Sequence, residues 1–289
     1  RRLLLLIALF GLILASLGLG FSKSFFVVFL WAILFSAMRA RISPIISAIV
    51  LDYLEEQNEI DSFSMLRLWG SVGFIIAAVG LGPLLEGAGV HWLPWLVLAG
   101  LAAIWLAAMV TPEGPGQHLE GHEHTPLRRL LSSPAVLAFL AACALMQASH
   151  GPYYTFFSLY MGDTGYSGLT TGILWGLGVG AEVVLFLIMA WLMRRFTLRV
   201  LLVASFVLAA LRWVVIGLWP EQIGLLLFAQ LLHAASFGSF HAAAIALVHR
   251  VFSGPNQGIG QALYSSLTFG AGGALGSLSS GLLWDGFGS

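Results

Sequence analysis

Residues 169–192 read LTTGILWGLGVGAEVVLFLIMAWL, an apolar run that holds one charged residue, Glu182. A helix needs about 20 apolar residues to cross the hydrocarbon core of a bilayer, so this run is long enough to do so. A backbone in lipid must satisfy its own hydrogen bonds, which predicts an α-helix. Comparable runs, bounded by charges, proline or glycine, give nine predicted spans in all: 3–20, 24–50, 65–85, 92–110, 134–160, 169–192, 198–218, 222–248 and 259–283.

The composition of the chain supports a membrane protein. Of its 289 residues, 59% are hydrophobic and 9% are charged, whereas soluble domains carry about a quarter charged residues. The formal net charge is zero, so nothing indicates a nucleic-acid partner. The single cysteine, Cys143, excludes an internal disulfide and a cysteine-based zinc site.

The lysines and arginines predict one orientation, because the cytoplasmic loops of membrane proteins are enriched in these residues. With the N-terminal end inside, threading nine helices leaves only Lys23 outside. Arg39, Arg41 and Arg212 fall within helices. The cytoplasmic side receives the remaining arginines: Arg1, Arg2, Arg67, Arg128, Arg129, Arg194, Arg195, Arg199 and Arg250.

The longest connection, residues 111–133, is polar and rich in proline and glycine. Such a segment is typical of a flexible linker, and the predicted orientation makes it cytoplasmic. We therefore predict an N-terminal bundle of four helices at 1–110 and a C-terminal bundle of five at 134–289. Many transporters have two six-helix halves joined in this way. On that template, two helices are expected before Arg1 and one after Ser289.

Two other patterns receive structural interpretations. The spacings Gly176-x-x-x-Gly180 and Gly272-x-x-x-Gly276 let helices approach closely, and we interpret them as packing within the chain rather than dimerisation. We accordingly expect a monomer. A polar loop is favoured over a metal site for the linker histidines, which are His118, His122 and His124.

Ionisable side chains interrupt the apolar runs of the C-terminal bundle. A charge at mid-bilayer costs about 2.5–3.5 kcal/mol on insertion scales, so each is a candidate functional residue. At a rise of about 1.5 Å per residue, Glu182 lies about 15 Å from the cytoplasmic end of its helix, Arg212 about 21 Å and His233 about 22 Å. These three groups are therefore expected near one level. The full set is His150, Glu182, Arg212, His233 and His241.

Two interpretations of this set stay open. Glu182 and Arg212 could form an ion pair that only orders the bundle. Alternatively, His233 competes for the carboxylate or relays a proton, so that protonation changes the pairing of Arg212 and biases which side of the protein is open. On a regular helix, His241 would lie two turns from His233 and about 80° round the axis.

Further candidates lie in the second and fifth spans. Arg39 and Arg41 point about 200° apart on a helix, so we expect one to line a pathway and bind an anion while the other snorkels or pairs elsewhere. The stretch His150-Gly151-Pro152-Tyr153-Tyr154 predicts either a kinked gate whose tyrosines contact substrate or an ordinary proline kink with interfacial aromatics.

The string Arg67-Leu68-Trp69-Gly70-Ser71-Val72-Gly73-Phe74 resembles the start of the fifth helix in the phenylpropionate permease family of the major facilitator superfamily. That family is akin to lactose permease and the nucleoside–proton symporters. The resemblance spans nearly the whole chain and continues through His150, Tyr153, Tyr154, Trp175, Glu182, Arg212, His233, His241, Gln261 and Tyr264.

This resemblance implies an all-α major facilitator fold, with nine of twelve helices present, in the inner membrane of a bacterium. It implies proton-coupled symport of a small aromatic acid-like solute by alternating access, the two bundles rocking about a midplane cavity and no cofactor or metal taking part. Proton coupling would fall to Glu182, Arg212, His233 and His241. The predicted substrate-binding residues, from the resemblance and from the two arginines of the second span, are Arg39, Arg41, His150, Tyr153, Tyr154, Trp175, Gln261 and Tyr264.

The sequence departs from the family at Pro44-Ile45-Ile46-Ser47-Ala48, where the family tends to have an acid, so the role of that acid is not expected here. Sugar or nucleoside symport and drug efflux are alternatives on the same fold. A membrane-embedded enzyme or a non-transporting sensor would be a different class. An enzyme is disfavoured because no His-Glu-x-x-His helix or Gly-x-Ser-x-Gly elbow occurs.

Overall fold

The computed structural model describes residues 2–57, 62–111, 132–252 and 256–287. It consists of two compact units: unit 1 comprises residues 1–70 and 84–120, and unit 2 comprises residues 71–83 and 121–289. Most of the predicted linker, residues 112–131, lies outside the described residues, as do the three linker histidines.

Unit 1 is built around its first helix, α1, which packs against α2 and α4. Leu5 and Leu9 of α1 meet Ile49 and Ala108 in a buried core. Trp105 joins this core, and its indole N–H donates to the carbonyl oxygen of Leu6 at 3.3 Å. The helices that contribute to unit 1 are α1 (Arg2–Phe21), α2 (Phe25–Glu56), the two ends of α3 (Ser62–Ala88), the 3-10 turn η1 (Val90–Trp92) and α4 (Leu93–Val110).

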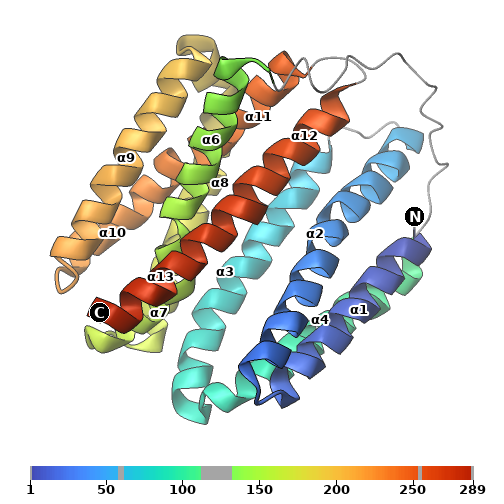
Figure 1. The fold of residues 1–289 in the computed structure, drawn as a ribbon, viewed down its shortest axis with the longest axis vertical. Coiled ribbons are helices and arrows are strands. Elements are labelled where there is room, and N and C mark those ends of the chain that lie inside the picture. Colours follow the sequence, from blue (N-terminus) through green and yellow to red (C-terminus); the bar gives the residue numbers. More distant parts are fainter. Residues whose placement is uncertain (1, 58–61, 112–131, 253–255, 288–289) are drawn as a thin grey trace. The chain divides into compact units, whose positions relative to one another are not determined.

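Unit 2 holds the rest of the helices and the middle of α3. In it α8 packs against α10, α9 packs against α10 and α11, and α7 lies beside α13 (Figure 1). Its helices are α6 (Pro134–Ser149), α7 (Gly151–Asp163), α8 (Gly168–Arg195), α9 (Leu198–Leu218), α10 (Ile223–His233), η2 (Ala234–Gly238), α11 (Ser239–Val251), α12 (Gln257–Ser265), η4 (Ser266–Gly272) and α13 (Gly273–Phe287).

The predicted all-α membrane fold is confirmed. Each of the nine predicted ranges is helical over most of its described residues, and seven of the described helices are long and apolar enough to cross a membrane. In α2 the described apolar stretch is Phe25–Arg39. The number of crossings, nine, stays a prediction.

Three of the predicted spans contain irregular turns. The range 134–163 breaks at His150, which ends α6 and precedes α7, and Pro152 stands in the first turn of α7. Proline fits a first turn because its missing N–H is not needed there. The segments η2 and η4 are π-helices, which are rare and often occur at functional sites. The sequence predicted the first break and neither π-helix.

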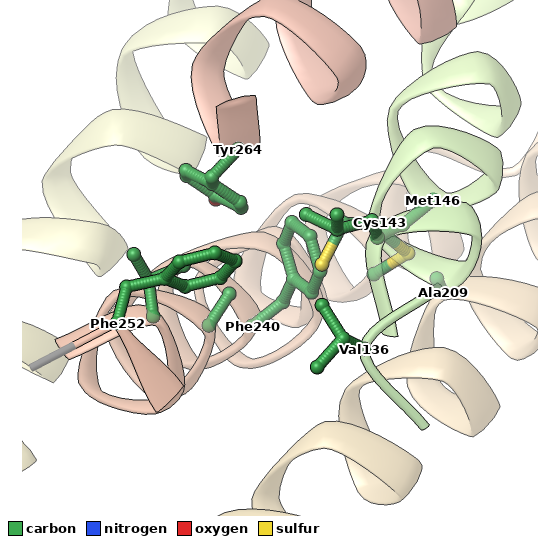
Figure 2. Close-up of a cluster of buried hydrophobic side chains, with 10 residues drawn as sticks. Val136, Cys143, Met146, Ala209, Phe240, Phe252 and Tyr264 are labelled. Atoms are coloured by element: carbon green, nitrogen blue, oxygen red, sulfur yellow. The ribbon is translucent and has the colours of Figure 1, made fainter. Parts of the chain in front are cut away.

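One hydrophobic core cluster of unit 2 lies where α6, α9, α11 and α12 meet (Figure 2), and a second lies around Tyr153 and Leu226. Phe240, Phe252 and Tyr264 are fully buried in the first cluster. The remaining buried members are Val136, Leu140, Cys143, Met146, Ala209, Ala244 and Val248.

Glycines set the closest helix contacts of unit 2. A Cβ at Gly276 would lie 2.3 Å from the carbonyl oxygen of Ala148, and one at Gly272 would lie 2.3 Å from that of Ala144. The Gly272-x-x-x-Gly276 spacing therefore packs η4 and α13 directly on the backbone of α6. The other predicted spacing is used in part, since a Cβ at Gly176 would contact Ile75 at 3.4 Å while Gly180 has open space around it in the described residues.

We expect Gly276→Ala to lower the thermal unfolding midpoint of the purified protein in detergent, measured by tryptophan fluorescence. The added methyl group meets a backbone carbonyl that cannot rotate away, and overpacking of this kind costs about 1–3 kcal/mol. Gly281→Ala, on the same helix, is the matched control, because a Cβ there meets nothing within 4 Å. Equal midpoints for the two variants would contradict the backbone contact.

Candidate functional site

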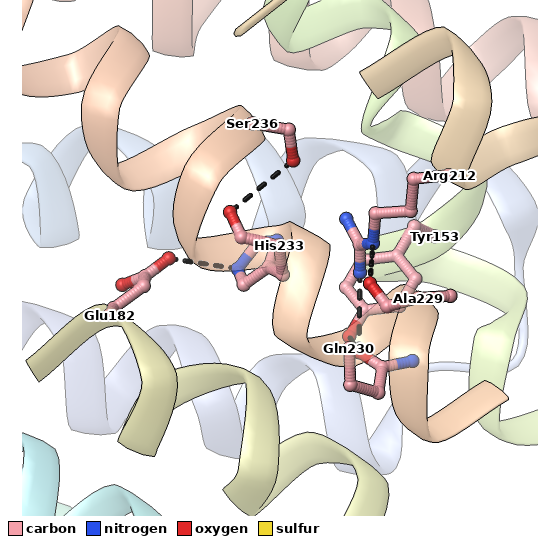
Figure 3. Close-up of polar contacts among 7 residues, drawn as sticks. All are labelled: Tyr153, Glu182, Arg212, Ala229, Gln230, His233 and Ser236. Carbon is pink, nitrogen blue, oxygen red and sulfur yellow. Dashed lines mark hydrogen bonds and ion pairs between the residues drawn. The ribbon is translucent and has the colours of Figure 1, made fainter. Parts of the chain in front are cut away.

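Arg212 is the buried charge at the centre of unit 2. It is fully buried on α9, and its guanidinium group bonds to the neighbouring helix α10 (Figure 3). Nε donates to the carbonyl oxygen of Ala229 at 3.1 Å, and Nη2 donates to Oε1 of Gln230 at 3.3 Å. A buried charge is stable only where such partners replace water.

Two aromatic rings enclose the same guanidinium group. Its central carbon lies 4.0 Å from the ring centroid of Tyr153 and 4.6 Å from that of Trp213. The hydroxyl group of Tyr153 donates to Oε1 of Gln230 at 2.8 Å. One amide oxygen therefore accepts from both Tyr153 and Arg212, which fixes the side chains of three helices to each other.

Some buried donors at this site have no hydrogen-bond partner among the described residues. They are Nη1 of Arg212, Nε2 of Gln230 and Nε1 of Trp213. A buried donor without an acceptor costs about 1–3 kcal/mol. The guanidinium end of the site therefore has unused hydrogen-bond donors beside a positive charge. Other buried atoms that lack a hydrogen-bond partner in this part of the chain are Oε1 of Glu182, Nε2 of His150 and Nδ1 of His233.

Glu182 contacts His233 rather than Arg212. Its carboxylate oxygen Oε1 lies 2.9 Å from Nε2 of His233 (Figure 3), and both side chains are largely buried, with exposed fractions of 18% and 6%. Of the alternatives that the sequence left open, this geometry is the one in which His233 competes for the carboxylate. The contact is an ion pair when His233 carries a second proton.

Two glycines allow α8 to approach α10 and η2 at this contact. A Cβ at Gly178 would lie 3.4 Å from Oε1 of Gln230 and 3.4 Å from the ring of His233. A Cβ at Gly238 would lie 3.6 Å from Cγ of Glu182 and 2.8 Å from Leu185. Larger residues at these positions would push the carboxylate away from the histidine.

His150 and the aromatic residues of α7 complete the cluster. Nδ1 of His150 lies 2.8 Å from the carbonyl oxygen of Met146, and its ring meets that of Trp213 edge-on with centroids 4.8 Å apart. The ring centroid of Trp175 lies 4.5 Å from that of Tyr153. Tyr154 stacks on Trp175 at 6.2 Å with an interplanar angle of 16°.

The structure brings most of the predicted site residues together. Glu182, Arg212, His233, His150, Tyr153, Tyr154 and Trp175 form one cluster. His241 lies on α11 with Nδ1 3.1 Å from the hydroxyl oxygen of Tyr264. Gln261 is on α12, one turn before Tyr264, and its Oε1 is buried.

The predicted arginines of the N-terminal bundle are both on α2 in unit 1. Arg39 is exposed, and the side chain of Arg41 lies outside the described part of the structure. A role for either of them in substrate binding stays a prediction.

Sequence reasoning missed Gln230 and Phe237. Gln230 is a fully buried polar residue in an apolar helix, so the rule that selected His233 would have selected it too. Phe237 contacts His233 and His150, and nothing in its residue type distinguishes it from the other apolar residues of the span.

This fold and buried cluster define a polytopic helical membrane protein of the major facilitator type. The sequence profile of the MFS_1 like family matches residues 1–289, and the chain belongs to that family.

Its relatives agree with the resemblance seen in the sequence. The chain is 30% identical over 226 residues to the "Probable 3-phenylpropionic acid transporter" of Escherichia coli (strain K12), which covers 77% of this chain and 59% of that protein. It is 26% identical to the maltose permease of Geobacillus stearothermophilus, over 93% of this chain and 66% of that protein. The chain thus spans less than two thirds of the length of these relatives.

Solved structures share the fold. The crystal structure of the nucleoside transporter NupG matches with a TM-score of 0.83 at 17% identity, covering 99% of this chain and 75% of that one. A bacterial homologue of the human lysosomal transporter Spinster, in an inward-facing and unoccupied conformation, matches with a TM-score of 0.71 at 16% identity, over 99% and 69% of the two chains.

Tyr153 provides a test of the cluster. Tyr153→Phe removes one hydrogen bond to Gln230 and keeps the ring at Arg212, so we expect a stability loss of about 0.5–1.5 kcal/mol. Tyr153→Leu also removes the cation–π contact, which is worth about 2 kcal/mol when desolvated, and it should lower the unfolding midpoint further. Tyr154→Phe is the control. Identical midpoints for Tyr153→Phe and Tyr153→Leu would show that the ring does not stabilise Arg212.

Proposed function

We propose that the protein is a secondary active transporter that couples the movement of a small aromatic carboxylate to protons by alternating access. The observation that supports this most is the contact between Glu182 and His233 in the same bundle as the fully buried, incompletely bonded Arg212. A carboxylate and an imidazole in contact can hold a proton between them. Gain or loss of that proton changes the electrostatic energy of a buried arginine in the same bundle.

The proposed coupling follows from the arrangement of charges. When Glu182 is ionised, its negative charge balances a protonated His233 and part of the field of Arg212. When Glu182 is protonated, that charge is lost and Arg212 remains uncompensated within a buried cluster. An anionic substrate would then be the favourable partner for Arg212. Proton binding and anion binding are thereby linked, as symport requires.

The unused donors support a carboxylate as the substrate group. Arginine presents a planar fork of donors that matches a carboxylate, and Nη1 of Arg212 has no partner in the part of the chain that the structure describes. Tyr153, Tyr154 and Trp175 provide aromatic surface next to it, against which an aromatic ring packs well. The relative named as a 3-phenylpropionic acid transporter has a substrate of this chemistry.

The tests below also distinguish other substrates and the other direction of transport. Relatives or structural neighbours are named for maltose and nucleosides, so a sugar or nucleoside substrate is the alternative on this fold, and efflux is the alternative direction. We place the protein in the inner membrane of a bacterium, as a monomer whose partners are its solute, protons and lipid.

Glu182→Gln should abolish proton-driven accumulation of radiolabelled 3-phenylpropionate in proteoliposomes and reduce it to the level seen without a gradient. The amide cannot exchange a proton with His233, while its size and hydrogen bonding are close to those of the acid. Glu221→Gln, in the exposed turn between α9 and α10, is the control and should transport normally. Unchanged accumulation by Glu182→Gln would refute the coupling role.

Arg212 should determine ligand binding. We expect 3-phenylpropionate to raise the unfolding midpoint of the wild-type protein and to leave that of Arg212→Lys unchanged, because lysine keeps the charge but lacks the planar fork. Maltose and a nucleoside are measured in parallel. Stabilisation by either of these, with none by 3-phenylpropionate, would contradict the carboxylate substrate.

A further inference from the structure

Three rings stand in a ladder along α10, η2 and α11. The rings of His233 and Phe237 stack with centroids 5.4 Å apart and an interplanar angle of 8°. The rings of Phe237 and His241 follow at 6.3 Å and 5°. The ladder ends at Tyr264, whose hydroxyl oxygen lies 3.1 Å from Nδ1 of His241. A phenyl ring therefore separates two histidines that face the same side.

The π-helix η2 produces this alignment. Eight residues of a regular α-helix leave His241 about 80° away from His233 around the axis. A π-turn takes in one extra residue for the same rotation, which leaves about 20° between the two positions. The residues Ala234–Gly238 adopt this turn. The expectation from regular geometry was therefore wrong about the direction of His241, and both histidines point to one face.

Glu182 lies along that face, next to His233 and Gly238. It contacts His233 directly, and Cγ of Glu182 lies 3.6 Å from where a Cβ of Gly238, the residue after Phe237, would stand. Gly238 stands three residues before His241 in the chain, so the carboxylate would have to rotate, and α8 to move, before it could leave His233 and reach His241.

Phe237 is the member of the ladder that cannot take part in proton transfer. Its ring carries no hydrogen-bonding group, and it is closely surrounded by the rings of His150 at 5.3 Å and Tyr154 at 6.2 Å. Among the described residues, the titratable or charged groups near the ladder are His150, Tyr153 and Tyr154 from α7 and its cap, Glu182 from α8, Arg212 from α9 and Tyr264 from α12.

We propose that Phe237 is an insulating ring which prevents direct proton exchange between His233 and His241, so that a proton passes between them only on the carboxylate of Glu182. In this sequence His233 gives a proton to the Glu182 oxygen, and the resulting carboxylic acid gives it to the neutral nitrogen of His241. No other bond changes. The inference rests on the proposed proton coupling, and it adds the reason why protons do not leak past the site.

The physical argument is that a proton hop needs an unbroken hydrogen-bonded connection. Water between the two imidazoles would supply one, and the stacked ring occupies that space. The transfer through Glu182 instead requires the carboxylate to leave one histidine for the other. Proton passage then depends on the position of α8 relative to α10 and α11, three helices of unit 2.

The test measures substrate-free proton flux with a pH-sensitive dye inside proteoliposomes, under an imposed pH gradient with potassium and valinomycin. We expect a low flux for the wild type and a several-fold higher flux for Phe237→Ala, because water can then connect the histidines. Phe237→Leu should stay close to wild type, since it fills most of the space with apolar atoms. Phe228→Ala, at an exposed position on α10, controls for loss of a phenyl ring.

A second variant separates the two routes. In the double variant Phe237→Ala/Glu182→Gln the leak should persist, because the direct route does not use the carboxylate. A wild-type flux in Phe237→Ala, or a leak that disappears when Glu182 is replaced, would overturn the inference.

If Phe237→Ala does not elute as a folded species in size-exclusion chromatography, Phe237→His takes its place. It keeps a planar ring, adds a proton carrier and should also leak, and wild-type flux would equally overturn the inference.

The readout is independent of the substrate. If wild-type protein does not couple protons to 3-phenylpropionate but Phe237→Ala leaks, the proposed symport fails while the insulating role of Phe237 stands. Coupled uptake with no leak in either Phe237 variant means that the symport stands and the insulating role fails.

Discussion

The desolvation of one guanidinium group governs the centre of this protein. Arg212 is fully buried, and a buried charge is tolerated only with partners that replace its hydration. Its partners come from three helices: the ring of Tyr153 from α7, a carbonyl and an amide oxygen from α10 and the indole of Trp213 from its own helix. The positions of α7, α9 and α10 are therefore interdependent. One nitrogen, Nη1, is still without an acceptor in the described residues.

Close helix contacts make that arrangement possible. A methyl group at Gly178 would just contact Gln230 and His233, and one at Gly238 would contact Glu182 and press against Leu185. Membrane helices have no hydrophobic driving force between them, so small residues that allow close packing take its place. The same device holds α6 to η4 and α13 through Gly272 and Gly276. Glycine here determines which polar groups can meet.

The sequence was sufficient for the class of fold and for much of the site. Charged residues are so costly in lipid that Glu182, Arg212 and His233 stood out without any structure, and the rise per residue brought them to one level. The break at His150 followed from the Gly-Pro pair. Side-chain direction was harder to predict. The π-turn of Ala234–Gly238 depends on tertiary packing rather than on residue type, so the approach of His241 to the face of His233 had no signal in the sequence. Pairing of Glu182 with His233 instead of Arg212 was likewise a matter of which partner lay nearer.

The interruption at His150 divides one predicted membrane crossing into two short rods, α6 and α7. The break interrupts the ladder of backbone hydrogen bonds, so packing rather than one continuous helix sets the angle between the two rods. Both rods are held by close glycine contacts: α6 meets Gly272 and Gly276, and a Cβ at Gly151 of α7 would lie 2.3 Å from the backbone of Gly276. A tilt of α7 about the break would move Tyr153 and Tyr154 together, and it would cost the contacts of Tyr153 with Gln230 and Arg212. The two tyrosines of the site therefore stand directly beside the break between α6 and α7.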